Sequence, residues 1–170
     1  MNTQQIENIL SRIIPPNRCG FLGVFAKDKI PSPNSLTHTF PLCFVANTHD
    51  SHMPGEHWLA FFYDSPTSLE FFDSYGLSPD FYNFQISPTR MNHHPIQSLA
   101  SSVCGQYCIF YLYHRSLGYS LSKILSSFST TDLDWNDKRV SHFICKNFSF
   151  PCTSSHKTKC QCCVSRNCQK

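Results

Sequence analysis

The chain has 170 residues, of which 41% are hydrophobic and 15% charged, and it contains 15 Phe and 7 Tyr. This length and composition allow one buried core and exclude disorder over most of the chain. No run approaches the roughly 18 uninterrupted apolar residues of a membrane span, and the polar segment 1–10 lacks the pattern of a secretory signal. We therefore expect an intracellular protein that is not secreted, whose ten cysteines are mostly reduced thiols.

The net charge of +3 is unevenly distributed. Residues 1–137 carry seven Lys/Arg and all eleven acids, a balance of −4, whereas residues 138–170 carry the other seven Lys/Arg and no acid, a balance of +7. Such a basic segment is a candidate surface for DNA or for an acidic partner. A solvated segment without a partner is an equal alternative.

In chain order, the first half predicts one helix followed by strands. Apolar residues at helical spacing over 6–14 predict a helix that ends at Pro15. The continuous apolar run 40–45 has the length of a strand. Two further runs, 57–63 and 69–73, are separated by turn-forming residues and predict a β-hairpin in a buried sheet.

The second half predicts helices. Residues 104–117 are apolar almost all round, which predicts a buried central helix, and Ser101 and Ser102 stand where N-caps belong. A third helical pattern covers 121–128, and a fourth begins near Asp132.

We assign one domain to residues 1–150 and a basic, Cys-rich tail to residues 151–170, which we expect to be flexible. The tail has enough soft ligands for zinc but lacks paired C-x₂-C spacing, so we favour a tail without metal; these ligands are Cys152, His156, Cys160, Cys162, Cys163 and Cys168. The pair His93-His94 also suggests a metal, but in a loop we expect it to be solvated, and we assign no metal ligand.

Cys104 is a candidate nucleophile because it stands at the start of a predicted helix. A helix N-terminus or a nearby imidazolium favours the thiolate, and the amides there would face an oxyanion. Gly105 lets backbone or substrate approach closely. From position alone, a buried structural thiol is an equal alternative. Cys108, one turn further along the helix, is expected to be inert core.

Three other residues could act with this cysteine. Gln97 stands seven residues before Cys104, where its amide could donate a hydrogen bond into an oxyanion hole. His57 opens one strand of the predicted hairpin and Asp73 closes the other, so the carboxylate could orient the imidazole. Taken singly, each of these residues is more often structural or solvated than catalytic.

Together, three segments resemble the signature blocks of the adenovirus-type cysteine protease (adenain) family, which includes relatives from adenovirus-like or Polinton-type elements. These segments are Gly-Glu-His-Trp-Leu-Ala-Phe at 55–61, Phe-Asp-Ser-Tyr-Gly at 72–76, and the stretch from Gln97 to Cys108. They occur in the order of the family. The resemblance covers most of residues 1–115, is weak beyond them and does not reach the tail.

The resemblance implies an α+β fold with a papain-like cysteine protease core in which the His precedes the Cys in the chain. A mixed β-sheet would pack against helices, including a buried central helix that starts at the catalytic Cys. It also implies the roles of the site residues: His57 as general base, Asp73 as its partner, Gln97 as oxyanion-hole donor and Cys104 as nucleophile.

The implied function is a thiol endopeptidase that cleaves viral or virus-like capsid or core precursor proteins during virion maturation, in the host nucleus or the virion. The chemistry would require no cofactor. DNA, bound through residues 138–170, or a peptide could act as an activator. We expect a monomer that does not bind a membrane. Three features depart from the family. The chain is shorter, and its helical second half diverges. Asp73 replaces the Glu of adenoviral enzymes, and no cysteine between Asp73 and Cys104 could bind the family's disulfide-linked activator peptide.

Two alternatives stay open from the sequence. One is a protease that removes ubiquitin-like or SUMO modifiers, a related group of enzymes that uses Asp as the acid. The other is a DNA-binding or virion structural protein that does not catalyse a reaction.

Overall fold

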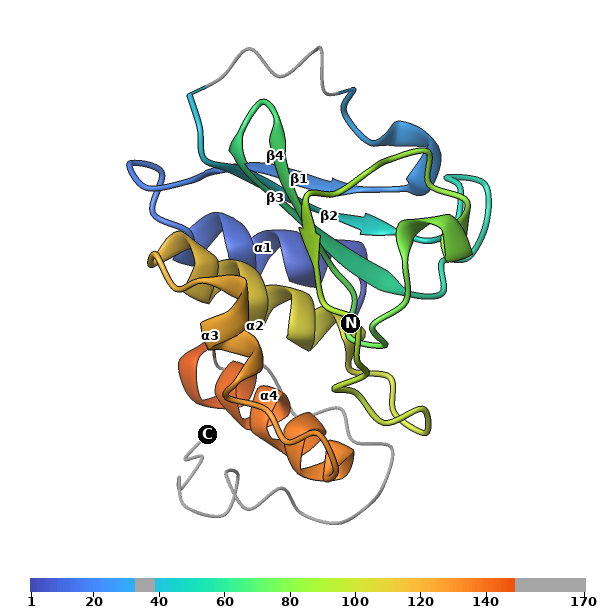
Figure 1. The fold of residues 1–170 in the computed structure, drawn as a ribbon, viewed down its shortest axis with the longest axis vertical. Coiled ribbons are helices and arrows are strands. Elements are labelled where there is room, and N and C mark those ends of the chain that lie inside the picture. The colour runs from blue at the N-terminus through green and yellow to red at the C-terminus, as the bar shows by residue number, and fades with distance from the viewer. Residues whose placement is uncertain (33–38, 149–170) are drawn as a thin grey trace, which may run out of the picture.

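The computed structural model describes residues 1–32 and 39–148, so the predicted tail, 151–170, lies outside the described residues. The described part has an α+β fold, as predicted, built on a mixed five-stranded sheet in the order β1-β2-β3-β4-β5 (Figure 1). The strands are β1 (Gly20–Phe25), β2 (Leu42–Asn47), β3 (Trp58–Ser65), β4 (Ser68–Phe72) and β5 (Arg90–Met91). The outer pairs β1–β2 and β4–β5 are parallel, and the inner pairs β2–β3 and β3–β4 are antiparallel.

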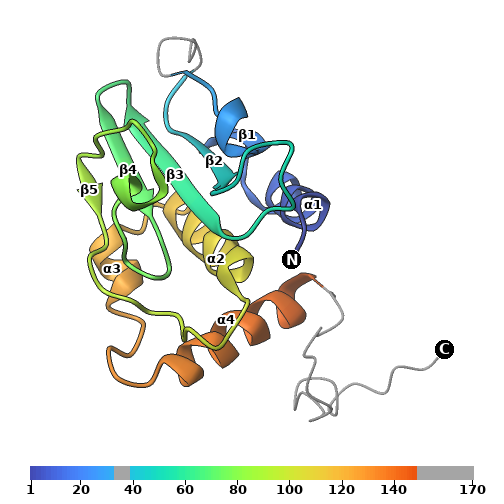
Figure 2. The ribbon, with the colours of Figure 1, turned by 90° about the vertical axis from the view of Figure 1, so that its right-hand side faces the viewer.

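Helices cover one face of this sheet, and the described helices are α1 (Thr3–Ile13), α2 (Cys104–Ser116), α3 (Leu121–Leu125) and α4 (Leu133–Phe148). α1 and α2 pack against the sheet, α2 along β3, and α4 packs on α2 (Figure 1, Figure 2). Because α2 has neighbours on several sides, its apolar residues run almost all round, as the sequence indicated. In the described part no helix combines the length and apolar character needed to span a membrane.

The second face of the sheet is covered by loops. Cys43 and Val45 of β2 pack with α1 and α2, whereas Phe44 and Ala46 belong to a separate apolar cluster that includes Phe84. A strand that is covered on both faces has a continuous apolar sequence instead of an alternating one. This is why β2 could be recognised as a strand from its composition.

Two strand predictions need correction. β2 begins at Leu42 instead of residue 40, because Pro41 has no N–H to contribute to the ladder. At its other end, β2 continues to Asn47. β5 is missing from the predicted strands, because two residues are too few to produce a pattern.

The predicted N-caps of the central helix are also wrong. The N-cap is Val103, and no side chain caps that helix end. The Ser101 hydroxyl instead donates to the backbone carbonyl of Ser98 at 3.0 Å. The helical pattern over 121–128 forms a helix only from Leu121 to Leu125.

A buried ion cluster fastens the C-terminal half of α2 to the sheet. Arg115 Nε donates to Glu70 Oε2 at 2.7 Å, and both side chains are buried. The Tyr111 hydroxyl donates to the same oxygen at 2.8 Å, and the Arg115 guanidinium lies 4.1 Å from the centre of the Phe62 ring. An ion pair removed from water in this way depends on both partners.

We expect Arg115→Ala to lower the free energy of unfolding by about 3 kcal/mol, because the buried Glu70 carboxylate loses its main cation. Arg90→Ala is the matched control, since Arg90 Nε lies 2.8 Å from Glu70 Oε1 but its side chain is 49% exposed; its loss should be about 1 kcal/mol or less. Urea unfolding followed by circular dichroism measures both. Equal losses would contradict this account of the cluster.

Candidate active site

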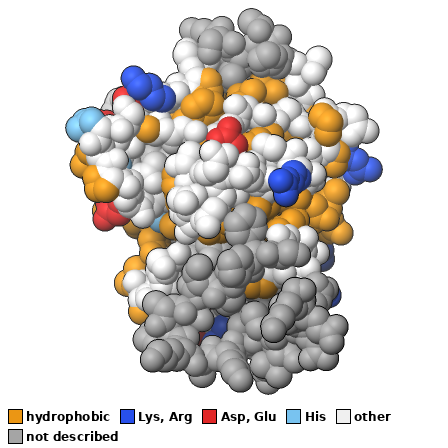
Figure 3. All heavy atoms as spheres, turned by 180° about the vertical axis from the view of Figure 1, so that it is seen from behind, with side chains coloured by type: hydrophobic (Ala, Val, Ile, Leu, Met, Phe, Trp, Pro, Cys, Tyr) orange, Lys and Arg blue, Asp and Glu red, His pale blue; other side chains and the backbone are white. Residues whose placement is uncertain are grey.

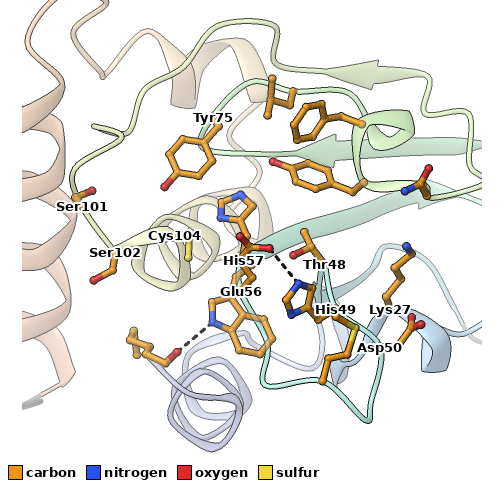
Figure 4. A pocket seen from close by; sticks show the side chains of 17 residues that line it. Lys27, Thr48, His49, Asp50, Glu56, His57, Tyr75, Ser101, Ser102 and Cys104 are labelled. Carbon is orange, nitrogen blue, oxygen red and sulfur yellow. Dashed lines mark hydrogen bonds and ion pairs between the residues drawn. The ribbon is translucent and has the colours of Figure 1, made fainter.

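The topology brings Cys104, His57 and Asp73 to one edge of the sheet. β3 and β4 are antiparallel, with Ala60 opposite Phe72, so His57 before β3 and Asp73 after β4 lie near each other. α2 packs along β3 and begins at Cys104, which places the sulfur at the same edge (Figure 4).

His57 and Asp73 form a buried pair. Nε2 of His57 lies 2.6 Å from Oδ1 of Asp73, and the Asp73 carboxylate is fully buried. Three further donors satisfy this carboxylate, at 3.0 Å each: the backbone N–H groups of Tyr75 and Leu77 and the hydroxyl of Tyr82. A carboxylate held by this many donors has a fixed orientation, and so has the imidazole bound to it.

The thiol of Cys104 interacts with the same imidazole. Burial raises the pKa of the Cys104 thiol. The hydrogen bond and charge of His57, together with a hydrogen bond from the Trp58 backbone N–H, lower this pKa by more than burial raises it, so the net shift is downward. Burial lowers the pKa of His57, whereas Asp73 and Cys104 raise it, with a net rise to about 9. Both shifts favour a thiolate–imidazolium pair.

Two tyrosines enclose the imidazole. The Tyr75 ring stacks on the His57 ring with centroids 4.6 Å apart, and the Tyr82 ring lies 5.8 Å away. Sequence reasoning did not assign a role to either tyrosine. Tyr75 lies inside one of the recognised blocks, but Tyr82 is in a short 3₁₀ turn (Pro79–Tyr82) that has no sequence signal of its own.

Gln97 lies behind the wall of the site and does not line the cavity. Its side chain is fully buried, and Nε2 donates to the Tyr75 hydroxyl at 3.2 Å and to the Ser101 carbonyl at 3.1 Å. Its Oε1 accepts from the Ser74 hydroxyl at 2.7 Å. The structure thus brings together His57, Asp73 and Cys104, while the amide donors of Gln97 are directed at Tyr75 and Ser101.

A cavity of about 720 Å³ opens beside Cys104 and His57 (Figure 4). Residues 48–58 contribute one part of its lining and residues 75–83 another. Two exposed apolar side chains line it, Met53 at 43% and Phe81 at 66% exposure. This cavity is large enough to accept several residues of an extended peptide.

Within 1–32 and 39–148, no group of three or more His, Cys, Asp or Glu side chains is placed to hold a metal ion. The cysteines of the predicted tail lie outside the described residues.

Comparison with known proteins finds viral proteases that are similar to part of this chain. No protein-family model matches the chain. The curated protease of bovine adenovirus C serotype 10 is 29% identical over 129 residues, which cover 63% of this chain and 64% of that protein. The chain is related to adenovirus proteases. The protease of frog adenovirus 1 (strain ATCC VR-896) is 32% identical over 113 residues, or 55% of this chain and 54% of that protein.

These matches confirm the relation predicted from the three sequence blocks. The chain spans 64% and 54% of the lengths of the two adenovirus proteases. Both proteins are named as proteases, and the names do not specify a nucleophile or a substrate.

Proposed function

We propose that the chain is a cysteine endopeptidase with a papain-like site, in which Cys104 is the nucleophile, His57 the acid–base group and Asp73 its orienting partner. The observation that carries this proposal is the unbroken series of contacts from the buried Asp73 carboxylate through His57 to a thiol at a helix N-terminus. This is the arrangement that activates a nucleophilic thiol.

The reaction has two steps. The Cys104 thiolate attacks the substrate carbonyl carbon, and the His57 imidazolium gives its proton to the leaving amine, which leaves an acyl-enzyme. A water molecule, deprotonated by His57, then attacks the thioester carbonyl and releases the carboxylic acid and the thiol. Asp73 stays ionised and stabilises the imidazolium.

We assign the backbone N–H of Cys104 and the Gln97 amide to the oxyanion hole. The start of α2 supports the first donor, because the N–H groups at a helix N-terminus have no partner within the helix. Gln97 lies behind Tyr75 and Ser101, so its amide must leave one of these partners to reach an oxyanion. The Gln97 assignment therefore requires a rearrangement of its side chain, whereas the Cys104 N–H assignment does not.

The pH dependence of turnover tests the ion pair. We expect kcat/KM to rise as Cys104 ionises, at a pH below the usual thiol value of 9.0, and to fall as His57 loses its proton near pH 9. Alkylation of Cys104 by iodoacetamide should rise over the same acidic limb and show no alkaline fall, because it needs only the thiolate. A turnover rate that still increases through pH 9 would contradict the role of His57 as the acid.

The proposed substrates are capsid or core precursor proteins, cleaved during virion maturation in the nucleus or the virion. The relation to adenovirus proteases supports this substrate class. No cysteine lies between Asp73 and Cys104 to hold a disulfide-linked activator as in the family, which favours a peptide activator that binds without a covalent bond.

DNA is a further proposed activator. Lys138, His142 and Lys146 are exposed on α4 at intervals of four residues, and such spacing places them on one side of the helix. On the face seen from behind in Figure 3, charged side chains of the described residues are scattered and do not form a basic patch. The row of basic side chains on α4 is the described feature that supports a contact with DNA.

Three assays together separate the remaining alternatives. A vinyl-sulfone derivative of SUMO that modifies Cys104 would favour a deconjugating enzyme. Salt-sensitive DNA binding combined with a Cys104 that iodoacetamide does not modify near neutral pH would favour a protein that does not catalyse a reaction. Cleavage of Gly-containing peptides without SUMO labelling is the outcome that we expect.

A further inference from the structure

Asp73 follows β4 at the point where the neighbouring strand, β5, no longer pairs with it. β4 and β5 pair in parallel with Glu70 opposite Arg90 and Phe71 opposite Met91, and β5 then ends. Asp73 lies just beyond this paired region, so its backbone N–H and carbonyl need partners from elsewhere.

The side chain of Asn92 bonds to both groups, and the Asp73 carbonyl also accepts from the Gly76 N–H at 2.9 Å. Oδ1 of Asn92 accepts a hydrogen bond from the Asp73 N–H at 3.1 Å, and Nδ2 donates to the Asp73 carbonyl at 2.5 Å. The carboxamide therefore pairs with Asp73 as a peptide group of a neighbouring strand would. Asn92 is only 3% exposed, so this pair of bonds is made away from water.

This contact belongs to a seam, by which we mean the contacts between the irregular segments 73–76 and 92–97. The Ser74 carbonyl accepts from the N–H groups of both Ile96 and Gln97, at 2.9 and 3.1 Å. A Cβ added to Gly76, which has a φ of 70°, would lie 2.5–2.7 Å from backbone atoms of His94. The seam is thus close-packed as well as hydrogen-bonded, and Asn92 is its contact with the backbone of the acid.

We propose that Asn92 is a positioning residue that substitutes for the missing strand and holds Asp73 where its carboxylate meets His57. This inference rests on the proposed function. Among side chains of this size, only a primary carboxamide offers a donor and an acceptor in one plane. Aspartate at this position would turn an acceptor toward the Asp73 carbonyl. Alanine would leave the buried Asp73 N–H unpaired, and the carbonyl would keep only its bond from the Gly76 N–H.

The test is the pH profile of Cys104 alkylation in the full chain, with iodoacetamide as probe and the modified peptide identified by mass spectrometry. For Asn92→Asp and Asn92→Ala we expect the alkylation midpoint to move up by about one pH unit, since a displaced Asp73 supports the imidazolium less well. We also expect kcat/KM to fall by about 10- to 100-fold, mainly through kcat. Asn147→Asp, an exposed site on α4, is the matched control and should leave both unchanged.

The outcomes separate the two claims. If wild-type Cys104 reacts like an ordinary thiol, the proposed function fails. If wild-type Cys104 has the lowered midpoint and the folded Asn92 variants share it, with only a lower melting temperature, the positioning role is overturned. Where Asn92→Ala does not fold, Asn92→Ser, which keeps one hydroxyl near the Asp73 backbone, replaces it, with an intermediate shift as the expected result.

Discussion

Cys104→Ala is expected to remain folded and to lose about 10⁵- to 10⁶-fold in kcat/KM on Gly-containing peptides, because no other group can form the acyl-enzyme. Cys104→Ser should lose nearly as much, since a serine hydroxyl has no tendency to form an anion beside His57. Steady-state kinetics with purified protein, together with thermal melting, measures both quantities.

Cys108→Ala is the control for these variants. Cys108 lies one turn further along α2, is buried, and burial keeps its pKa well above the usual value, so it is an unreactive core thiol. Its replacement should lower stability by roughly 1 kcal/mol and leave kcat/KM close to wild type. Cleavage by Cys104→Ala at the wild-type rate would remove the basis of the proposed function.

Asp73→Asn is expected to lower kcat/KM by about 10³- to 10⁴-fold. Each carboxylate oxygen of Asp73 accepts one backbone N–H, from Tyr75 at Oδ1 and from Leu77 at Oδ2, both at 3.0 Å. Whichever way an asparagine is turned, its –NH₂ group meets one of these donors. The side chain must therefore move or the loop must open, and the imidazolium loses its counter-charge in either case.

The same variant changes the chemistry of the thiol, which distinguishes it from a variant that is simply destabilised. Without the carboxylate, the pKa of His57 falls, the ion pair weakens, and Cys104 should need a higher pH for alkylation. Asp80→Asn is the control, because Asp80 is exposed on the neighbouring 3₁₀ turn. A folded Asp73→Asn enzyme with wild-type turnover and an unchanged alkylation profile would show that Asp73 does not act on the site.

The pairing of His57 with Asp73 could be predicted because it depends on local order. Two apolar runs joined by a turn form a hairpin, and the beginning of one antiparallel strand is always near the end of its partner. The central helix could be predicted for the same reason, since its pattern is continuous. The predicted boundaries were wrong where a single residue determines the end of an element, as at Pro41 before β2 and at the N-cap Val103 of α2.

The supporting contacts could not be predicted from the sequence. Asn92 and Tyr82 reach Asp73 from irregular segments, and no periodic pattern indicates where such segments lie in space. The hydrogen bonds of Gln97 depend in turn on how these segments pack against each other. Sequence alone could predict that His57, Asp73 and Cys104 lie close together, but not the contacts that hold them in place.

The irregular segment from Asn92 to Cys104 has a consequence for how the protein would lose activity. At one end, Asn92 bonds to the backbone of Asp73. The other end continues directly into the first turn of α2. Displacement of the whole stretch would move the carboxylate and the sulfur together and should abolish turnover, whereas a change confined to one end, such as Asn92→Ala, should leave a weakened enzyme.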